Sequence, residues 1–256
     1  KREVATLGPR WTNLSSRDDF LLRMGDQRIK TPAICASIIG ENIRSMKKGS
    51  KRALNQGADI LEMRLDKLKS GENWKPLMSS KAPLIITNRS EKEGGHFEGK
   101  EEERIEILKK AIHAGADCID IELSADAEER NQVISEAEEK GAATIMSFHD
   151  FDKVPAIKDM KKKAKRMEDA GCDIAKIIGF AKDAEGSIRM LDFLIRSAEE
   201  IEIPVIAFAM GKEGKITRLA STLLGSPITY ASVEEKAAPG QYDLLTTKKI
   251  LDKFRN

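Results

Sequence analysis

Short apolar runs rich in β-branched residues alternate with charged stretches along most of the chain, starting at residue 32. Runs of this length predict buried strands, and the charged stretches between them have the spacing of amphipathic helices. The eight predicted strands span residues 33–39, 59–65, 83–89, 118–123, 143–149, 174–180, 204–210 and 228–233.

Helix signals fill the intervals between these strands. In the segment 100–115, Ile105, Leu108 and Ile112 recur at spacings of three and four residues. The same reasoning predicts helices over residues 158–171, 187–200 and 241–254. Charged runs such as 101–104 and 161–166 are then expected to be solvent-exposed helix faces.

Three junctions share one pattern, in which a glycine ends a predicted helix and an aspartate opens the next strand. They are Gly57-Ala58-Asp59, Gly115-Ala116-Asp117 and Gly171-Cys172-Asp173. Glycine at this position supplies the left-handed residue that terminates a helix.

A strand–helix alternation repeated eight times predicts an α/β fold with a parallel sheet covered by helices. About 225 residues in eight such units matches a closed (β/α)₈ TIM barrel. A doubly wound open sheet is the alternative, and it is less favoured because no G-x-G-x-x-G follows the first strand. We therefore predict a single catalytic barrel domain over residues 32–256. Residues 1–31 lack this alternation of apolar runs and charged helical stretches, and we interpret them as a short N-terminal extension, partly ordered at best.

Composition narrows the class of protein. With 40% hydrophobic and 34% charged residues, the chain can form a core, which excludes intrinsic disorder. The 44 basic and 42 acidic residues nearly cancel, so bulk charge gives no reason to expect nucleic acid or a membrane as partner. Three cysteines without a C-x-x-C pair argue against a disulfide framework or a structural zinc site. Together with an N-terminus that lacks an apolar leader, they predict a cytoplasmic protein.

Polar side chains collect toward the carboxyl ends of the predicted strands, where barrel enzymes place their catalytic groups. These residues are Ser37, Glu62, Arg64, Thr87, Arg89, Glu122, Ser147, His149 and Lys176. Residues two apart in a strand share a face, so several of these side chains are expected to point into one site.

Lys176 is the sharpest signal because it interrupts an otherwise apolar strand. One interpretation is a structural ion pair with Glu62 or Glu122. The other is a Schiff-base lysine that attacks a ketone as the free amine. We expect Arg64, Arg89 and His149 to provide the cationic surroundings that favour the free amine.

His149 is predicted to act as an acid–base group because its strand neighbours the lysine strand. Arg64, Arg89 and Arg218 either pair with nearby glutamates or bind an anionic substrate, since guanidinium groups recognise carboxylates. A lysine, an imidazole and arginines suit carbon–carbon cleavage or elimination next to a ketone. These residues alone do not choose between an aldolase and a dehydratase.

Six motifs occur in a fixed order between residues 62 and 241. They are E-x-R-x-D from Glu62, R-S-x-x-E-G-G from Arg89, S-x-H-D from Ser147, D-I-x-K ending at Lys176, M-G-x-x-G-x-x-x-R ending at Arg218, and A-P-G-Q ending at Gln241. In these motifs the chain resembles the type I 3-dehydroquinate dehydratases (3-dehydroquinases) of the shikimate pathway, over residues 32 to about 250.

The resemblance implies a barrel, usually homodimeric, that converts 3-dehydroquinate to 3-dehydroshikimate without a metal or cofactor. It implies that Lys176 forms the imine, that His149 is the general acid–base group and that Glu93 orients it. It assigns Arg218 to the substrate carboxylate. It assigns substrate binding or charge balance to Ser37, Glu62, Arg64, Arg89 and Gln241, the last from a loop that closes over the site.

One position departs from the family pattern. Ala237 stands where the family often has a serine, so a hydroxyl contact is lost and substrate affinity or loop closure is expected to differ while activity is retained. Three rival hypotheses are a class I Schiff-base aldolase acting on another small keto acid, a non-catalytic barrel, and a docking role for residues 1–31.

Overall fold

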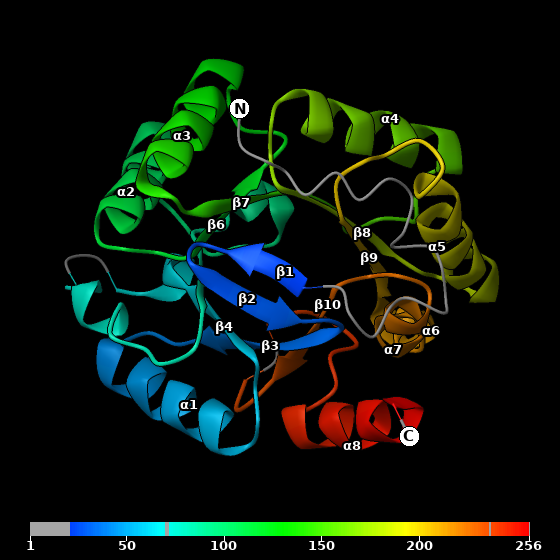
Figure 1. The fold of residues 1–256 in the computed structure, drawn as a ribbon, viewed down its shortest axis with the longest axis horizontal. Helices are drawn as coiled ribbons and strands as arrows, with labels where there is room; N and C mark the ends of the chain where they lie inside the picture. Colours follow the sequence, from blue (N-terminus) through cyan, green and yellow to red (C-terminus); the bar gives the residue numbers. More distant parts are fainter. Residues whose placement is uncertain (1–20, 70–71, 236, 256) are drawn as a thin grey trace.

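The structure is a computed structural model that describes residues 21–69, 72–235 and 237–255. Eight parallel strands form one sheet in the order β10-β3-β4-β5-β6-β7-β8-β9, and the helices surround it (Figure 1). The strands are β3 Ala33–Ile39, β4 Ile60–Arg64, β5 Leu84–Thr87, β6 Cys118–Glu122, β7 Ala143–Asp150, β8 Ile174–Phe180, β9 Val205–Met210 and β10 Ile228–Ser232. The predicted (β/α)₈ barrel is confirmed.

The described residues between β4 and β5 form only 3₁₀ turns, where the strand–helix alternation predicts a helix, and the other seven barrel strands are followed by α-helices. The helices are α1 Ile43–Asn55, α2 Glu101–His113, α3 Ala127–Lys140, α4 Ile157–Asp169, α5 Ala184–Ser197, α6 Gly211–Gly214, α7 Thr217–Leu223 and α8 Leu244–Arg255, with short 3₁₀ turns η3 Leu65–Lys67, η4 Lys75–Leu77 and η5 Glu91–Glu93. In the described part of the chain, none of the helices has the length and apolar character needed to span a membrane.

The repeated glycine–aspartate junctions have a structural cause. Gly57, Gly115 and Gly171 all have positive φ angles, of 87°, 91° and 84°. The carboxylates of Asp59, Asp117 and Asp173 accept hydrogen bonds from the backbone N–H groups of Ile34, Leu84 and Thr144, at 2.8, 2.9 and 2.7 Å. Each aspartate thus fixes its own strand against the start of the preceding one, which helps set the register of the barrel.

The barrel interior is apolar toward the amino ends of its strands. Ile60, Ile85, Ile145, Ile174 and Ile206 belong to one buried cluster. Two further clusters fill the space between the sheet and the outer helices. The polar residues of the site therefore lie directly above a closely packed apolar layer inside the barrel.

A hairpin that the sequence analysis did not predict covers one end of the barrel (Figure 1). It consists of β1 Leu21–Met24 and β2 Gln27–Lys30, which pair antiparallel. Its apolar residues Leu22, Met24 and Ile29 are buried in the same cluster as the barrel interior. Residues 1–20 of the predicted extension lie outside the described residues, and the domain boundary at residue 31 stays a prediction.

Candidate active site

One open pocket lies at the carboxyl ends of the strands. All of the predicted site residues line it: Ser37, Glu62, Arg64, Arg89, Glu93, His149, Lys176, Arg218, Ala237 and Gln241. The structure thus brings together the residues that the sequence analysis selected from separate strands and loops.

Lys176 is buried, with 4% of its surface exposed, and its amine stays inside the barrel. Its Nζ donates to Asp120 Oδ2 at 2.9 Å and lies 3.9 Å from Glu62 Oε1. It also lies 4.2 Å from the centre of the Tyr230 ring. The charged groups nearest to the Lys176 amine are therefore two carboxylates, which point inward from β6 and β4. The prediction that cations surround the amine is wrong for these contacts.

Asp120 is the site residue that the sequence analysis missed. It is fully buried, and its Oδ1 accepts hydrogen bonds from Arg89 Nη2 at 2.7 Å and from Ser147 Oγ at 2.6 Å. Burial alone would raise the pKa of Asp120, but Arg89 and Lys176 hold it below its ordinary value of 3.8. The two-residue period of the strand could have identified Asp120, because it lies two residues before Glu122 on the same strand face.

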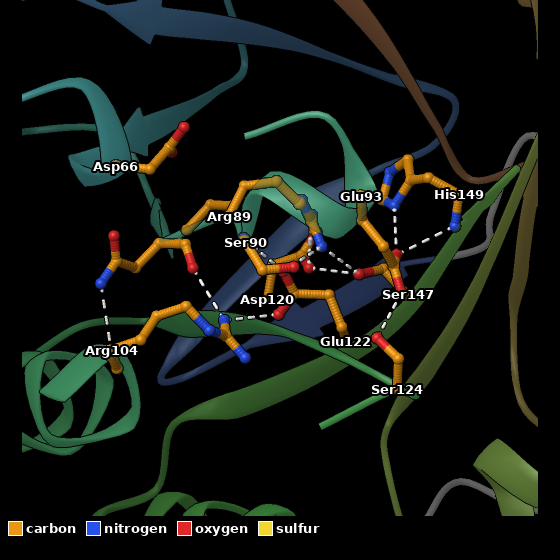
Figure 2. Close-up of polar contacts among 12 residues, drawn as sticks. Asp66, Arg89, Ser90, Glu93, Arg104, Asp120, Glu122, Ser124, Ser147 and His149 are labelled. Atoms are coloured by element: carbon orange, nitrogen blue, oxygen red, sulfur yellow. Dashed lines mark hydrogen bonds and ion pairs between the residues drawn. The ribbon is translucent and has the colours of Figure 1, made fainter. Parts of the chain in front are cut away.

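His149 is held by Glu93, as the resemblance implies (Figure 2). Glu93 Oε2 lies 3.0 Å from His149 Nδ1 and accepts the backbone N–H of His149 at 3.0 Å. Ser124 Oγ donates to the other Glu93 oxygen at 2.6 Å. With Nδ1 bonded to a carboxylate, the second ring nitrogen, Nε2, remains to exchange a proton with substrate.

The environment keeps His149 neutral. Burial, and then the positive charges of Arg89 and Lys176, hold the pKa of His149 well below its ordinary value of 6.5. A neutral imidazole at neutral pH is the form that a general base requires.

Glu62 on β4 is held by hydroxyl groups of the two neighbouring strands, β3 and β5. Its two oxygens accept hydrogen bonds from Ser37 Oγ at 2.7 Å and Thr87 Oγ1 at 3.0 Å. Gln241 Nε2 donates to Ser37 Oγ at 3.3 Å, and Gln241 Oε1 accepts the backbone N–H of Ala237 at 2.8 Å. The alanine therefore takes part through its backbone, which the missing hydroxyl does not change.

Arg64 is fixed by a residue of its own motif. Its Nε and Nη2 donate to the two oxygens of Asp66, both at 2.8 Å. Asp66 also accepts the backbone N–H of His96 at 3.1 Å, which ties the glycine-rich loop to the end of β4. Arg64 thus reaches the pocket with its charge largely balanced.

Arg218 differs from Arg64 and Arg89, the other arginines that line the pocket, because it forms no ion pair with any residue in the described ranges. It is 1% exposed, lies over the Phe208 ring at 4.5 Å and donates from Nη2 to the backbone oxygen of Pro239 at 3.0 Å. Its Nε has no hydrogen-bond partner. Burial lowers the pKa of Arg218 to about 9, which marks an uncompensated cation suited to an anionic ligand.

The described residues contain no group of three or more histidine, cysteine, aspartate or glutamate side chains arranged to hold a metal ion. A barrel with a pocket of ionisable groups at its strand ends is the architecture of an enzyme, and the fold and the site define this chain as one.

Comparison with known proteins specifies the family. A family model described as Type I 3-dehydroquinase matches residues 34–255. A 3-dehydroquinate dehydratase from Methanosarcina barkeri is 39% identical over 87% of this chain and 95% of its own length. The chain belongs to the type I 3-dehydroquinase family.

Solved structures agree with this assignment. The 3-dehydroquinate dehydratase of Geobacillus kaustophilus has a TM-score of 0.86 and 27% identity, covering 93% of this chain and 97% of its own. The type I enzyme of Clostridium difficile, solved with covalently modified comenic acid, has a TM-score of 0.85 and 27% identity, covering 92% and 97%.

Proposed function

We propose that this protein is a 3-dehydroquinate dehydratase of the shikimate pathway that works through an imine on Lys176. The observation that carries the proposal is the shared pocket of an enclosed lysine, a histidine kept neutral and an arginine without an ion pair. The relatives named for this activity and the covalently modified ligand of the Clostridium difficile enzyme support it. Three free, buried cysteines fit a reducing compartment, and we place the enzyme in the cytoplasm.

The chemistry follows from the geometry. The Lys176 amine attacks the ketone, and loss of water gives an iminium that acidifies the adjacent C–H. His149 Nε2 takes that proton, and the resulting enamine expels the β-hydroxyl. The imidazolium returns the proton to the departing oxygen, so the hydroxyl leaves as water. Hydrolysis of the remaining imine frees the enone product and Lys176.

A direct assay tests this function. The purified protein is incubated with 3-dehydroquinate, and the ultraviolet absorbance of the conjugated product is followed together with the mass of the product. Loss of one water supports the dehydratase. Carbon–carbon cleavage products would instead support the class I aldolase alternative, and an unchanged substrate would contradict both.

Arg218→Met should raise the KM for 3-dehydroquinate about 100-fold, because hydrogen bonds to charged groups contribute about 1.5–3 kcal/mol each and every 1.4 kcal/mol is a factor of ten. We expect a smaller fall in kcat, since Arg218 binds the carboxylate and not the reacting carbon. Steady-state kinetics measure both, and Arg218→Lys should recover part of the affinity. A KM for Arg218→Met within twofold of the wild-type value would remove Arg218 from substrate binding.

We also propose that the enzyme is a homodimer, and that the apolar surface of α5 and α7 forms the contact. Ile188 and Ile195 on α5 are 67% and 50% exposed and lie seven residues apart, on one helix face. Ile216 and Leu223, at the two ends of the adjoining α7, are 59% and 41% exposed. Single apolar residues on a surface are ordinary, but a group shared by two neighbouring helices indicates an interface.

Sedimentation equilibrium tests the interface. We expect the wild-type protein to be a dimer and the double variant Ile188→Asp/Ile195→Asp to be a folded monomer. Leu245→Asp on α8, which is 56% exposed, is the matched control and should stay dimeric. A dimeric double variant would place the contact elsewhere, and a monomeric wild type would contradict the dimer itself.

A further inference from the structure

Arg104 is a buried arginine in the first turn of α2, outside the barrel wall and outside the pocket lining. The charged run 101–104 predicts a solvent-exposed helix face, and this prediction is wrong for Arg104, which is only 1% exposed. It is among the largest fully buried side chains of the described residues. Removing a charged guanidinium from water is unfavourable unless specific partners accept its hydrogen bonds.

The partners of Arg104 flank the strand end that carries Arg89. Arg104 Nη1 donates to the backbone oxygen of Asn88 at 2.7 Å and to Glu122 Oε2 at 2.5 Å. The other Glu122 oxygen accepts the backbone N–H of Ser90 at 2.8 Å. Residues 88 and 90 are thus both fixed, one by Arg104 directly and one through Glu122, so the backbone of Arg89 is held on each side.

From this point the contacts lead to both reacting groups, and Figure 2 shows the part that includes Arg89, Asp120 and the Glu93–His149 pair. Arg89 lies 3.4 Å from Glu122 Oε1 and donates to Asp120, which in turn accepts from Lys176. The same loop continues into η5, where Glu93 contacts His149. Arg104 therefore supports the start of a loop in which Arg89 bonds Asp120, the partner of the lysine, and Glu93 bonds the histidine.

The outer end of this network reaches the surface. Glu101 accepts from Arg104 Nε at 2.8 Å and Nη2 at 2.6 Å, and its side chain is 39% exposed. Glu101 orients the guanidinium, so Arg104 presents Nη1 to the barrel in one orientation only. Buried ion pairs contribute little net stability compared with apolar packing. The ion pairs of Arg104 with Glu101 and Glu122 are distinguished by their contacts to the loop that carries Arg89 and Glu93.

We propose that Arg104 is a positioning residue for catalysis, which acts through Glu122 and the 88–90 backbone on Arg89 and on the Glu93–His149 pair. This inference rests on the proposed function for its kinetic consequence, but its structural consequence can be measured without substrate.

The test compares Arg104→Met with Arg189→Met. Arg189 on α5 is a matched control because it too pairs with a glutamate of its own helix, Glu185, and donates to a loop carbonyl, that of Val154, without contacting the site. We expect Arg104→Met to lower kcat about 10- to 100-fold, the scale of loss when reacting groups shift by about 1 Å, with a smaller change in KM. Arg189→Met should stay within twofold, and Arg104→Lys should restore part of kcat by restoring the charge.

NMR titration of the His149 ring supplies the readout that needs no substrate. The charged groups that act on His149 are Arg89, Lys176, Asp120 and Glu122, together with Glu93 at its Nδ1. Removing Arg104 leaves the Glu122 charge less compensated, so the pKa of His149 should rise in Arg104→Met and stay at the wild-type value in Arg189→Met.

The outcomes separate the two proposals. A His149 titration in Arg104→Met identical to wild type, or a loss of activity explained fully by the folded fraction and not recovered by Arg104→Lys, would overturn the positioning role. Absence of dehydratase activity in the wild type would overturn the proposed function, while the NMR result would still decide whether Arg104 controls the histidine.

Discussion

Lys176→Met is expected to lower kcat for 3-dehydroquinate about 10⁴-fold or more, the scale seen when a covalent nucleophile is removed. The reason is chemical: without the amine there is no iminium to acidify the neighbouring C–H. Methionine keeps most of the side-chain volume, so the packing against Tyr230 is retained. Asp120 loses one partner but keeps Arg89 and Ser147, so we expect the variant to fold.

The control for this variant is Lys163→Met. Lys163 lies on α4, where its amine contacts the Phe148 ring at 4.0 Å outside the pocket. Circular dichroism checks folding, and steady-state assays measure turnover of both variants. Turnover by Lys176→Met within tenfold of wild type would exclude the imine mechanism, whereas loss in both variants would indicate a nonspecific effect of removing a lysine.

His149→Ala is expected to separate imine formation from elimination. General acid–base groups contribute about 10²- to 10⁴-fold, so kcat should fall by that factor while the lysine adduct still forms and accumulates. Mass spectrometry of the intact protein after reduction quantifies the adduct at several times. The second measurement is essential, because a fall in kcat alone would also follow from poor substrate binding.

His113→Ala is the matched control, since His113 is exposed and contacts Glu136 on the outer face of the barrel. It should behave as wild type in both measurements. If His149→Ala neither slows turnover nor accumulates adduct, the acid–base role belongs to another group.

The barrel could be predicted from the sequence because all eight strands are apolar runs and helical repeats separate most of them, although the described residues between β4 and β5 form only the 3₁₀ turns η3 and η4. The Gly-x-Asp junctions at Asp59, Asp117 and Asp173 repeat because the same backbone contact recurs. The β1–β2 hairpin was missed because strands of four residues are too short to establish an alternating pattern, although Leu22 and Met24 do alternate inward.

The site residues on the strands were predictable from the two-residue period, and loop residues such as Glu93 and Gln241 required the family resemblance. Asp120 shows that the same period, applied to every strand, would have found the partner of the lysine. Arg104 could not be found this way. A charged residue in a charged helical run has the pattern of a surface residue, and only the three-dimensional structure shows that it faces Glu122.

The central claim is that Lys176 forms the covalent bond, and borohydride reduction in the presence of 3-dehydroquinate tests it most directly. The treated protein is digested, and its peptides are mapped by mass spectrometry, with Lys176→Met carried through the same procedure. We expect one reduced adduct on the peptide that contains Lys176 and none in the variant. An adduct on a different lysine, or complete turnover of substrate with no adduct trapped anywhere, would contradict it.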